Sequence, residues 1–145
     1  MPETIAAEDR LAIQDNLLRY VWSLDTADTE GIVSTFTADG SVVAVDNERF
    51  SGAEGIRAFS QRAFAQPSFA GRQHHVQPVR FEKIDGGYLV TAYWFVITWD
   101  VGRPATLLSM GYYRDTCVKQ NGEWRFKEKI ITHWDGAKAP MSHKN

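Results

Sequence analysis

The sequence predicts an α+β domain in which helices cover one face of a curved antiparallel sheet. Two observations lead to this prediction. Segments with helical periodicity come first in the chain, and four strand-like segments joined by short turns come last. The chain has 145 residues, without an internal repeat or a linker-like stretch. We therefore expect a single domain over residues 1–145.

The first part of the chain contains three helical segments. From about residue 6 to 24, apolar residues recur at spacings of three and four, and no Gly or Pro interrupts them. A second, short helix is expected from Asp28, a good N-cap residue, through Phe36. Ser51 and Glu54 have capping-box spacing and predict the start of the third helix.

The strand-like segments carry turn signals between them. One buried strand is expected between the second and third helices, and the other four follow the third helix, with Asn121 and Gly122 forming a hairpin turn. The polar residues from about 136 onward are expected to be mobile. The predicted strands cover residues 41–45, 73–84, 88–100, 105–119 and 123–135.

The segment 88–100 is unusual because both of its faces carry bulky apolar side chains. Tyr93, Phe95 and Trp99 lie on one face, and Trp94 and Val96 lie on the other. An antiparallel strand with one solvated face should alternate apolar and polar residues. We therefore expect one face to meet the helices and the other to meet another subunit in a homo-oligomer.

Composition and charge exclude several classes of function. The chain has 16 Lys and Arg against 18 Asp and Glu, a formal charge of −2, which gives no electrostatic basis for binding nucleic acid or an anionic membrane. The single cysteine, Cys117, excludes an intramolecular disulfide framework and a multi-thiolate zinc site. The N-terminus does not resemble a signal peptide, and the sequence contains no long apolar run. We therefore expect a cytoplasmic protein.

Asp25 and His74 are the main candidates for chemistry. Asp25 follows three core-type residues that recur at every fourth position along the first helix, so an acid ends an apolar stripe. His74 and His75 begin a predicted strand and point to opposite faces. An Asp beside a His forms a general base, because the carboxylate orients the imidazole. The alternatives are a capping role for Asp25 and structural roles for the histidines.

Other residues complete the candidate site. Lys129 and His133 share one face of the last strand, either as solvated residues or as groups that stabilise an oxyanion. Metal binding is not expected, because no His pair has a ligand spacing. Nucleophile-elbow, P-loop and dinucleotide-binding motifs are also absent from the sequence. The aromatic residues with positions to line a pocket around His74 are Tyr20, Tyr93, Phe95, Trp99 and Tyr113.

Four stretches of sequence resemble the SnoaL-like branch of the NTF2-like superfamily. They read AIQDNLLRYVWSLDTADTEGIVSTFTADGSV, SGAEGIRAF, RQHHVQPVRFE and GYYRDTCVKQNGEWRFKEK, and the resemblance extends over roughly residues 6 to 135. It implies a cone-shaped α+β barrel with three N-terminal helices over the concave face of the sheet. The family includes dehydratases, a dehydrochlorinase, isomerases and dioxygenase small subunits, so the fold is implied more specifically than the reaction.

The resemblance also implies roles for individual residues. Asp25 and His74 match the positions of the base in the dehydratases and the dehydrochlorinase, which act without a cofactor. Tyr20 matches a substrate-contacting tyrosine of the bile-acid dehydratase. Lys129 and His133 stand where relatives have arginine. Neither side chain can donate the two parallel hydrogen bonds of a guanidinium group.

The function implied is therefore that of a cofactor-independent lyase acting on a small, flat and apolar substrate, for which we expect an aromatic compound. Dehydration, another elimination or a retro-aldol cleavage would each suit the base. The alternatives are an isomerase with the same base, or a non-catalytic small subunit of a ring-hydroxylating dioxygenase. The resemblance favours a trimer, with a dimer as the alternative.

Overall fold

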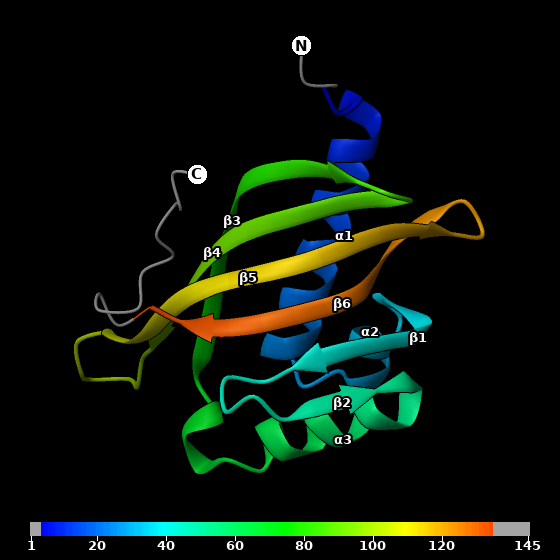
Figure 1. Cartoon of the computed structure of the whole chain (residues 1–145). Coiled ribbons are helices and arrows are strands. Elements are labelled where there is room, and N and C mark those ends of the chain that lie inside the picture. Colours follow the sequence, from blue (N-terminus) through cyan, green and yellow to red (C-terminus); the bar gives the residue numbers. More distant parts are fainter. Residues whose placement is uncertain (1–3, 135–145) are drawn as a thin grey trace.

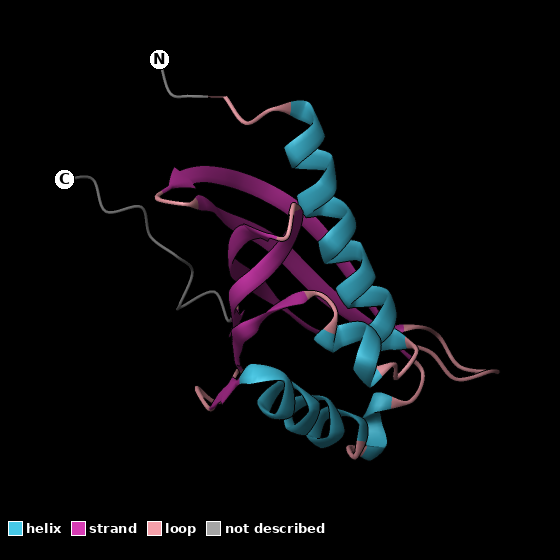
Figure 2. Ribbon diagram, turned by 90° about the vertical axis from the view of Figure 1, so that its right-hand side faces the viewer, coloured by secondary structure: helices cyan, strands magenta, loops and turns pink. Residues whose placement is uncertain are grey.

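A curved sheet forms one layer of the molecule, and helices form the other (Figures 1 and 2). The computed structural model describes residues 4–134. The α+β fold class predicted from the sequence is confirmed. The helices are α1 (Ala7–Asp25), α2 (Thr29–Val33), α3 (Gly52–Phe64) and the 3-10 helix η1 (Pro67–Phe69). The strands are β1 (Phe36–Val43), β2 (Arg49–Ser51), β3 (Arg72–Ile84), β4 (Gly87–Thr98), β5 (Thr106–Gln120) and β6 (Glu123–His133).

The sheet is mixed, whereas the sequence predicted an antiparallel one. Its strand order is β2-β1-β6-β5-β4-β3, and the pairing of β1 with β6 is parallel. Strands β3 to β6 pair antiparallel, because each short turn reverses the direction of the chain. Strand β1 is joined to that meander through α3, and this long connection permits the parallel pairing.

The second helix is shorter than predicted, and the strand after it is longer. Helix α2 ends at Val33, and Phe36 begins β1. Phe36 is 5% exposed and pairs with Phe126 of β6, so burial in the sheet outweighs the local turn signals that follow it. A register shift between Phe36 and Ser41 accommodates those turn residues.

The predicted capping box at the start of α3 does not form. Ser51 occupies the N-cap position but makes no side-chain cap hydrogen bond. Glu54 instead pairs with Arg57, which also binds Glu30 of α2. Ser51 ends β2, a short strand that the sequence did not predict, and it pairs there with Ser41 of β1.

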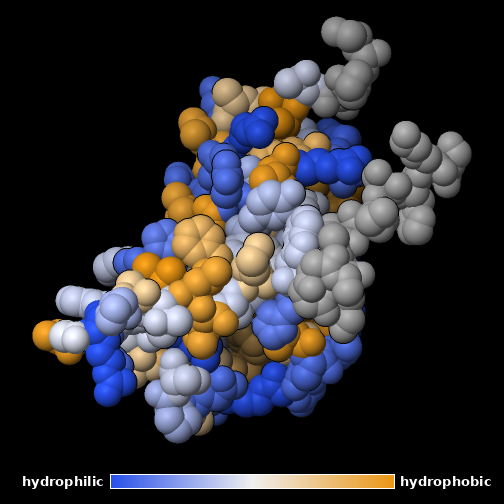
Figure 3. Space-filling view, turned by 90° about the vertical axis from the view of Figure 1, so that its left-hand side faces the viewer, coloured by the Kyte–Doolittle hydropathy of each residue, from blue (hydrophilic) through white to orange (hydrophobic). Residues whose placement is uncertain are grey.

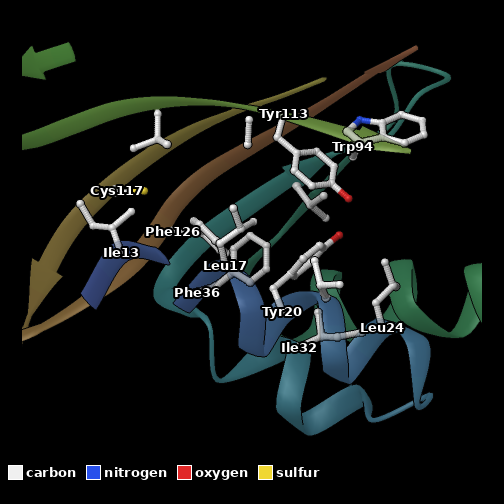
Figure 4. Packing of buried hydrophobic residues seen from close by; sticks show 14 of the residues in the cluster. Ile13, Leu17, Tyr20, Leu24, Ile32, Phe36, Trp94, Tyr113, Cys117 and Phe126 are labelled. Atoms are coloured by element: carbon white, nitrogen blue, oxygen red, sulfur yellow. The ribbon is translucent and has the colours of Figure 1, made fainter. Parts of the chain in front are cut away.

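The core lies between α1 and the concave face of the sheet (Figure 4). On α1, the apolar residues at spacings of three and four are buried, as the periodicity predicted. On β4, the face that carries Trp94 and Val96 is buried under the helices, whereas Tyr93 and Phe95 are 45% and 43% exposed on the other face. The buried core residues of these two elements are Ile13, Leu17, Tyr20, Val21, Leu24, Tyr88, Val90, Ala92, Trp94 and Val96.

Within residues 4–134, no helix is long and apolar enough to span a membrane. The polar tail predicted to begin at about residue 136 lies outside the described residues.

Candidate active site

Asp25 and His74 are in direct contact, although 49 residues separate them in the chain. The Nδ1 of His74 lies 2.5 Å from Oδ1 of Asp25, and the backbone N–H of His74 donates to Oδ2 at 2.9 Å. Both side chains are largely buried, with exposed fractions of 9% for His74 and 17% for Asp25. The carboxylate therefore holds the imidazole at two points, and the ring has Nε2 left for other partners.

The position of Asp25 follows from the way α1 ends. Asp25 is the last residue of the helix, where the partial negative charge of the carbonyl groups makes an acid unfavourable. The capping role that competed with catalysis for Asp25 is filled by Asp28, whose side chain accepts a hydrogen bond from the N–H of Gly31. Asp25 is therefore available to His74, and the two hydrogen bonds from β3 offset the unfavourable helix end.

His74 lines a cavity of about 350 Å³ between the helices and the concave face of the sheet. The cavity walls are mostly apolar and aromatic, and this volume suits a small ring compound. Figure 3 shows the side of the molecule where β3 begins and β6 ends; hydrophobic side chains gather there, with hydrophilic side chains below them. The cavity is lined by Tyr20, Leu24, Ala44, Val45, Phe59, Arg62, Ala63, Gln66, Phe69, Arg72, His74, Trp94, Val96, Leu108, Ser109, Tyr113, Ile131 and His133.

Two buried hydrogen-bond donors among the described cavity residues have no partner. These are the hydroxyl of Tyr20 and the indole N–H of Trp94. Figure 4 shows the Tyr20 and Tyr113 hydroxyl groups pointing toward each other, with Trp94 beside Tyr113. Burial raises the pKa of both tyrosines well above their ordinary value, so they remain neutral donors at physiological pH. Unpaired donors are costly in a protein interior, and an oxygen atom of a ligand would satisfy them.

Gly111 shapes the cavity wall at Trp94. The two residues are directly paired across β4 and β5. A Cβ atom on Gly111 would lie 2.5 Å from the Trp94 ring and 2.0 Å from the carbonyl oxygen of Thr132. Only glycine therefore allows the indole to lie against β5, where it stacks on Tyr113 at a ring-centroid distance of 6.0 Å.

Three further residues that the sequence assigned to the site line the cavity with His74. Tyr20 comes from α1, Tyr113 from β5 and His133 from the end of β6. The ring of Tyr20 meets that of Tyr113 edge-on at 6.1 Å, and the His133 ring lies 5.6 Å from Trp94. The four predicted residues that line the cavity therefore come from four different elements of the fold.

Lys129 does not line the cavity, contrary to the sequence prediction. Its ammonium group is fully buried and donates to both carboxylate oxygens of Asp115, at 2.9 and 2.8 Å. Aromatic rings surround this ammonium group, with the Tyr113 centroid at 3.8 Å and the Phe126 centroid at 4.3 Å. Burial lowers the pKa of Lys129 and raises that of Asp115, because both charges are removed from water, while their mutual contact opposes both shifts.

Lys129 shares its strand face with the cavity residues Ile131 and His133, as predicted, but its ammonium group is held by Asp115 and does not reach the cavity. A β-bulge brings Phe126 onto this same face. Thr116 pairs with Glu128, but the next residue, Cys117, pairs with Phe126, so Lys127 is an extra residue in β6. Strict alternation would put Phe126 and Lys129 on opposite faces of the strand. The extra residue instead turns both side chains into the core.

The structure also places Tyr93, Phe95 and Trp99 away from the cavity that contains His74. Tyr93 and Phe95 lie on the outer face of β4, where they border a separate hollow with Met110. Trp99 is 55% exposed and donates its indole N–H to the carbonyl of Arg103. The structure does not bring these three side chains to the cavity: Tyr93 and Phe95 lie on the outer of the two bulky faces of β4, and Trp99 lies beyond the end of that strand.

Most of the other residues that line the cavity were not predicted as site residues, and Trp94 and Arg72 are two of them. Trp94 was expected to be a core or subunit-contact residue, and Arg72 was not considered. The strand period offered a signal for both, because Arg72 shares a strand face with His74 and Trp94 shares one with Val96.

Comparison with solved structures supports the fold. A protein of unknown function with a cystatin-like fold from Nostoc punctiforme is 20% identical and has a TM-score of 0.80, with 92% of this chain and 96% of that chain covered. Aln2 from a Streptomyces species is 20% identical, with a TM-score of 0.76 and coverage of 90% and 94%. A candidate scytalone dehydratase from Novosphingobium aromaticivorans is 22% identical, with a TM-score of 0.73 and coverage of 88% and 85%.

These identities establish a shared fold and nothing further. No curated protein matches the chain significantly. A family model for the SnoaL-like domain matches residues 6–129, which is most of the chain. The resemblance found in the sequence is thereby confirmed, and the chain belongs to the SnoaL-like domain family.

Proposed function

We propose that the protein is a cofactor-independent lyase that uses His74 as its general base on a small aromatic or alicyclic substrate. The observation that carries this proposal is the 2.5 Å contact between Asp25 and His74 at the wall of an apolar cavity. The SnoaL-like family, as the resemblance implies, contains dehydratases with an Asp and a His at these positions.

The geometry supports one tautomer of His74 in particular. A carboxylate can only accept, so Asp25 favours the proton on Nδ1 and leaves Nε2 with a free lone pair. An Nε2 in this state can remove a proton from a substrate carbon. The imidazolium that forms is stabilised by the adjacent carboxylate of Asp25.

For a β-hydroxy ketone the elimination balances without any added reagent. His74 takes the proton from the carbon between the carbonyl and the carbinol, and Tyr20 donates a hydrogen bond to the carbonyl oxygen as negative charge builds on it. The electron pair then forms the new carbon–carbon double bond as the carbon–oxygen bond breaks. The proton on His74 passes to the departing hydroxyl, so that water leaves and the enzyme returns to its starting state.

The cavity supports a substrate that is mainly apolar. Phe59, Phe69 and Trp94 contribute aromatic surface, and Val96 and Ile131 contribute aliphatic surface. Apolar walls with a few convergent polar groups are typical of sites that bind small organic molecules.

The proposal is tested by product analysis with 3-hydroxy-1-tetralone, whose dehydration gives 1-naphthol. We expect the wild-type protein to release one water per turnover and His74→Ala to lose activity by about 100- to 10,000-fold. His75→Ala is the matched control, because His75 points to the opposite face of β3 and stacks on Phe95. A product of unchanged mass would indicate an isomerase, and full activity in His74→Ala would refute the assignment of the base.

We also propose that the outer face of the sheet forms a contact between copies of the chain. Tyr93, Phe95, Leu107 and Met110 are 43 to 57% exposed there, and their solvation is unfavourable. Size-exclusion chromatography with light scattering tests this. We expect an oligomer for the wild type and a monomer after Phe95→Lys, and a monomeric wild type contradicts the proposal.

A further inference from the structure

Apart from two tyrosines, the ionisable side chains that line the cavity are all basic. Although the chain as a whole carries a formal charge of −2, the ionisable residues that line the cavity, apart from two neutral tyrosines, are Arg62, Arg72, His74 and His133. Among the described residues that line it, none is Asp or Glu. A cavity of this kind favours a ligand that brings negative charge.

Only one of the two cavity arginines is available to a ligand. Arg62 forms ion pairs with Asp46 and Glu48, so its charge is already neutralised. Within residues 4–134, no carboxylate lies within ion-pair distance of Arg72. Partial burial also lowers the pKa of Arg72, because it removes water from the guanidinium group.

The guanidinium of Arg72 is held in a fixed orientation. Nε donates to the carbonyl of Ser68 at 2.7 Å, and Nη2 donates to the hydroxyl of Ser68 at 2.8 Å. The guanidinium carbon lies 5.2 Å from the centre of the Phe69 ring. These contacts use one edge of the group, and Nη1 has no hydrogen-bond partner within the described chain. A donor that is already oriented binds with a smaller loss of side-chain entropy.

Arg72 is also placed to act on the same ligand as His74. The two residues are two positions apart on β3, so their side chains lie on the same face of the strand, and both line the cavity. Neighbouring side chains on one strand face are separated by about 7 Å, which is close to the width of a bicyclic ring. One ring could therefore contact both residues.

We infer that Arg72 binds a carboxylate on the substrate and thereby positions the ring against His74. The substrate class is then an aromatic or alicyclic carboxylic acid, with its anionic group at Arg72 and its reactive carbon at Nε2 of His74. This inference rests on the proposed function only for the role of His74. Recognition of the carboxylate by Arg72 is a matter of binding and can be measured without turnover.

The experiment compares 2-naphthoate with 2-naphthamide, which has the same ring and no charge, by isothermal titration calorimetry. We expect the wild type to bind 2-naphthoate more tightly and Arg72→Gln to weaken that binding by about tenfold or more, because a charge-assisted hydrogen bond is lost. Binding of 2-naphthamide should change by less than about twofold. Arg72→Lys keeps the charge without the fork and should give intermediate binding.

The matched control is Arg103→Gln, which removes an exposed arginine outside the cavity and should change neither affinity. Thermal unfolding of each variant separates a loss of fold from a loss of binding. The inference is overturned if the wild type binds 2-naphthoate no better than 2-naphthamide, including the case in which it binds neither, or if Arg72→Gln weakens both equally. The test substrate 3-hydroxy-1-tetralone has no carboxylate, so its dehydration reports on His74 and not on Arg72. A failure of the proposed lyase would therefore appear in the product analysis, with the preference for 2-naphthoate intact.

Discussion

Two acid–base pairs join distant parts of this chain, and their surroundings differ. Asp25 and His74 connect the end of α1 to the start of β3 at the wall of a cavity. Asp115 and Lys129 connect β5 to β6 beneath aromatic rings, with side-chain exposures of 1% and 0%. The first pair has a ring nitrogen available to a ligand, whereas the second is sealed from any ligand.

The comparison shows that a short contact between ionisable groups does not by itself indicate a catalytic site. Lys129 resembled a site residue in the sequence, but its ammonium group is occupied by Asp115 and by the faces of aromatic rings. A buried pair of this kind contributes to stability only as long as both partners are present. The Asp25–His74 pair is the one whose geometry permits proton transfer to another molecule.

The largest expected effect comes from breaking the sealed pair. Lys129→Met should lower the free energy of unfolding by about 3–5 kcal/mol, because Asp115 is then left as an uncompensated buried charge. Chemical denaturation followed by tryptophan fluorescence measures this change. The double variant Asp115→Leu with Lys129→Met should recover most of the loss, since no buried charge remains. A single variant as stable as the wild type would contradict the structural role.

A smaller free-energy effect, on activity rather than stability, is expected at the other pair. Asp25→Asn should lower kcat by about 100-fold, because an amide can donate to Nδ1 of His74 and move the ring proton to Nε2. The free energy of unfolding should change by less than about 1 kcal/mol, because the partner left behind is a neutral imidazole. Steady-state kinetics on 3-hydroxy-1-tetralone and denaturation of the same preparation measure both quantities. Unchanged kcat would remove Asp25 from the mechanism.

The smallest predicted effect concerns Tyr20, which contacts both regions. Its ring lies 4.5 Å from the Lys129 ammonium group, and its unpaired hydroxyl lies at the cavity. Tyr20→Phe keeps the ring and removes the unpaired hydroxyl, so it should raise the free energy of unfolding by about 1 kcal/mol and slow turnover about tenfold. Calorimetry measures the expected increase in stability, and kinetics on the same preparation measures the expected decrease in turnover. A variant that is both less stable and fully active would contradict this role.

The fold was largely predictable because its signals are local. The apolar spacing along α1, the N-cap at Asp28 and the turn at Asn121 each depend on a few neighbouring residues, and each agrees with the structure. The parallel pairing of β1 with β6 depends on contacts far apart in the chain, such as that between Phe36 and Phe126. A pattern within one segment holds no information about such a contact.

The candidate site was predictable only in part, for a similar reason. The resemblance implied a pairing of Asp25 with His74, and the structure brings the two side chains together. Alternation placed Lys129 on the same face as His133, but it could not reveal the ion pair with Asp115 on the neighbouring strand. It also could not reveal the bulge that turns Phe126 onto that face, since a bulge changes the period by one residue. The inner face of β4 was likewise undetermined, because Tyr93 and Trp94 are equally suited to a core.

The contact between Asp25 and His74 also closes a long loop in the chain. The 49-residue separation includes α2, α3 and η1, which supply Phe59, Arg62 and Phe69 to the cavity wall. The two ends of this segment are held together by the Asp25–His74 contact, so substitutions at the cavity residues of α3 would change the shape of the wall without replacing the carboxylate or the imidazole. Changes in ring size could therefore arise through substitutions in α3 alone, with the proton-transfer machinery inherited unaltered.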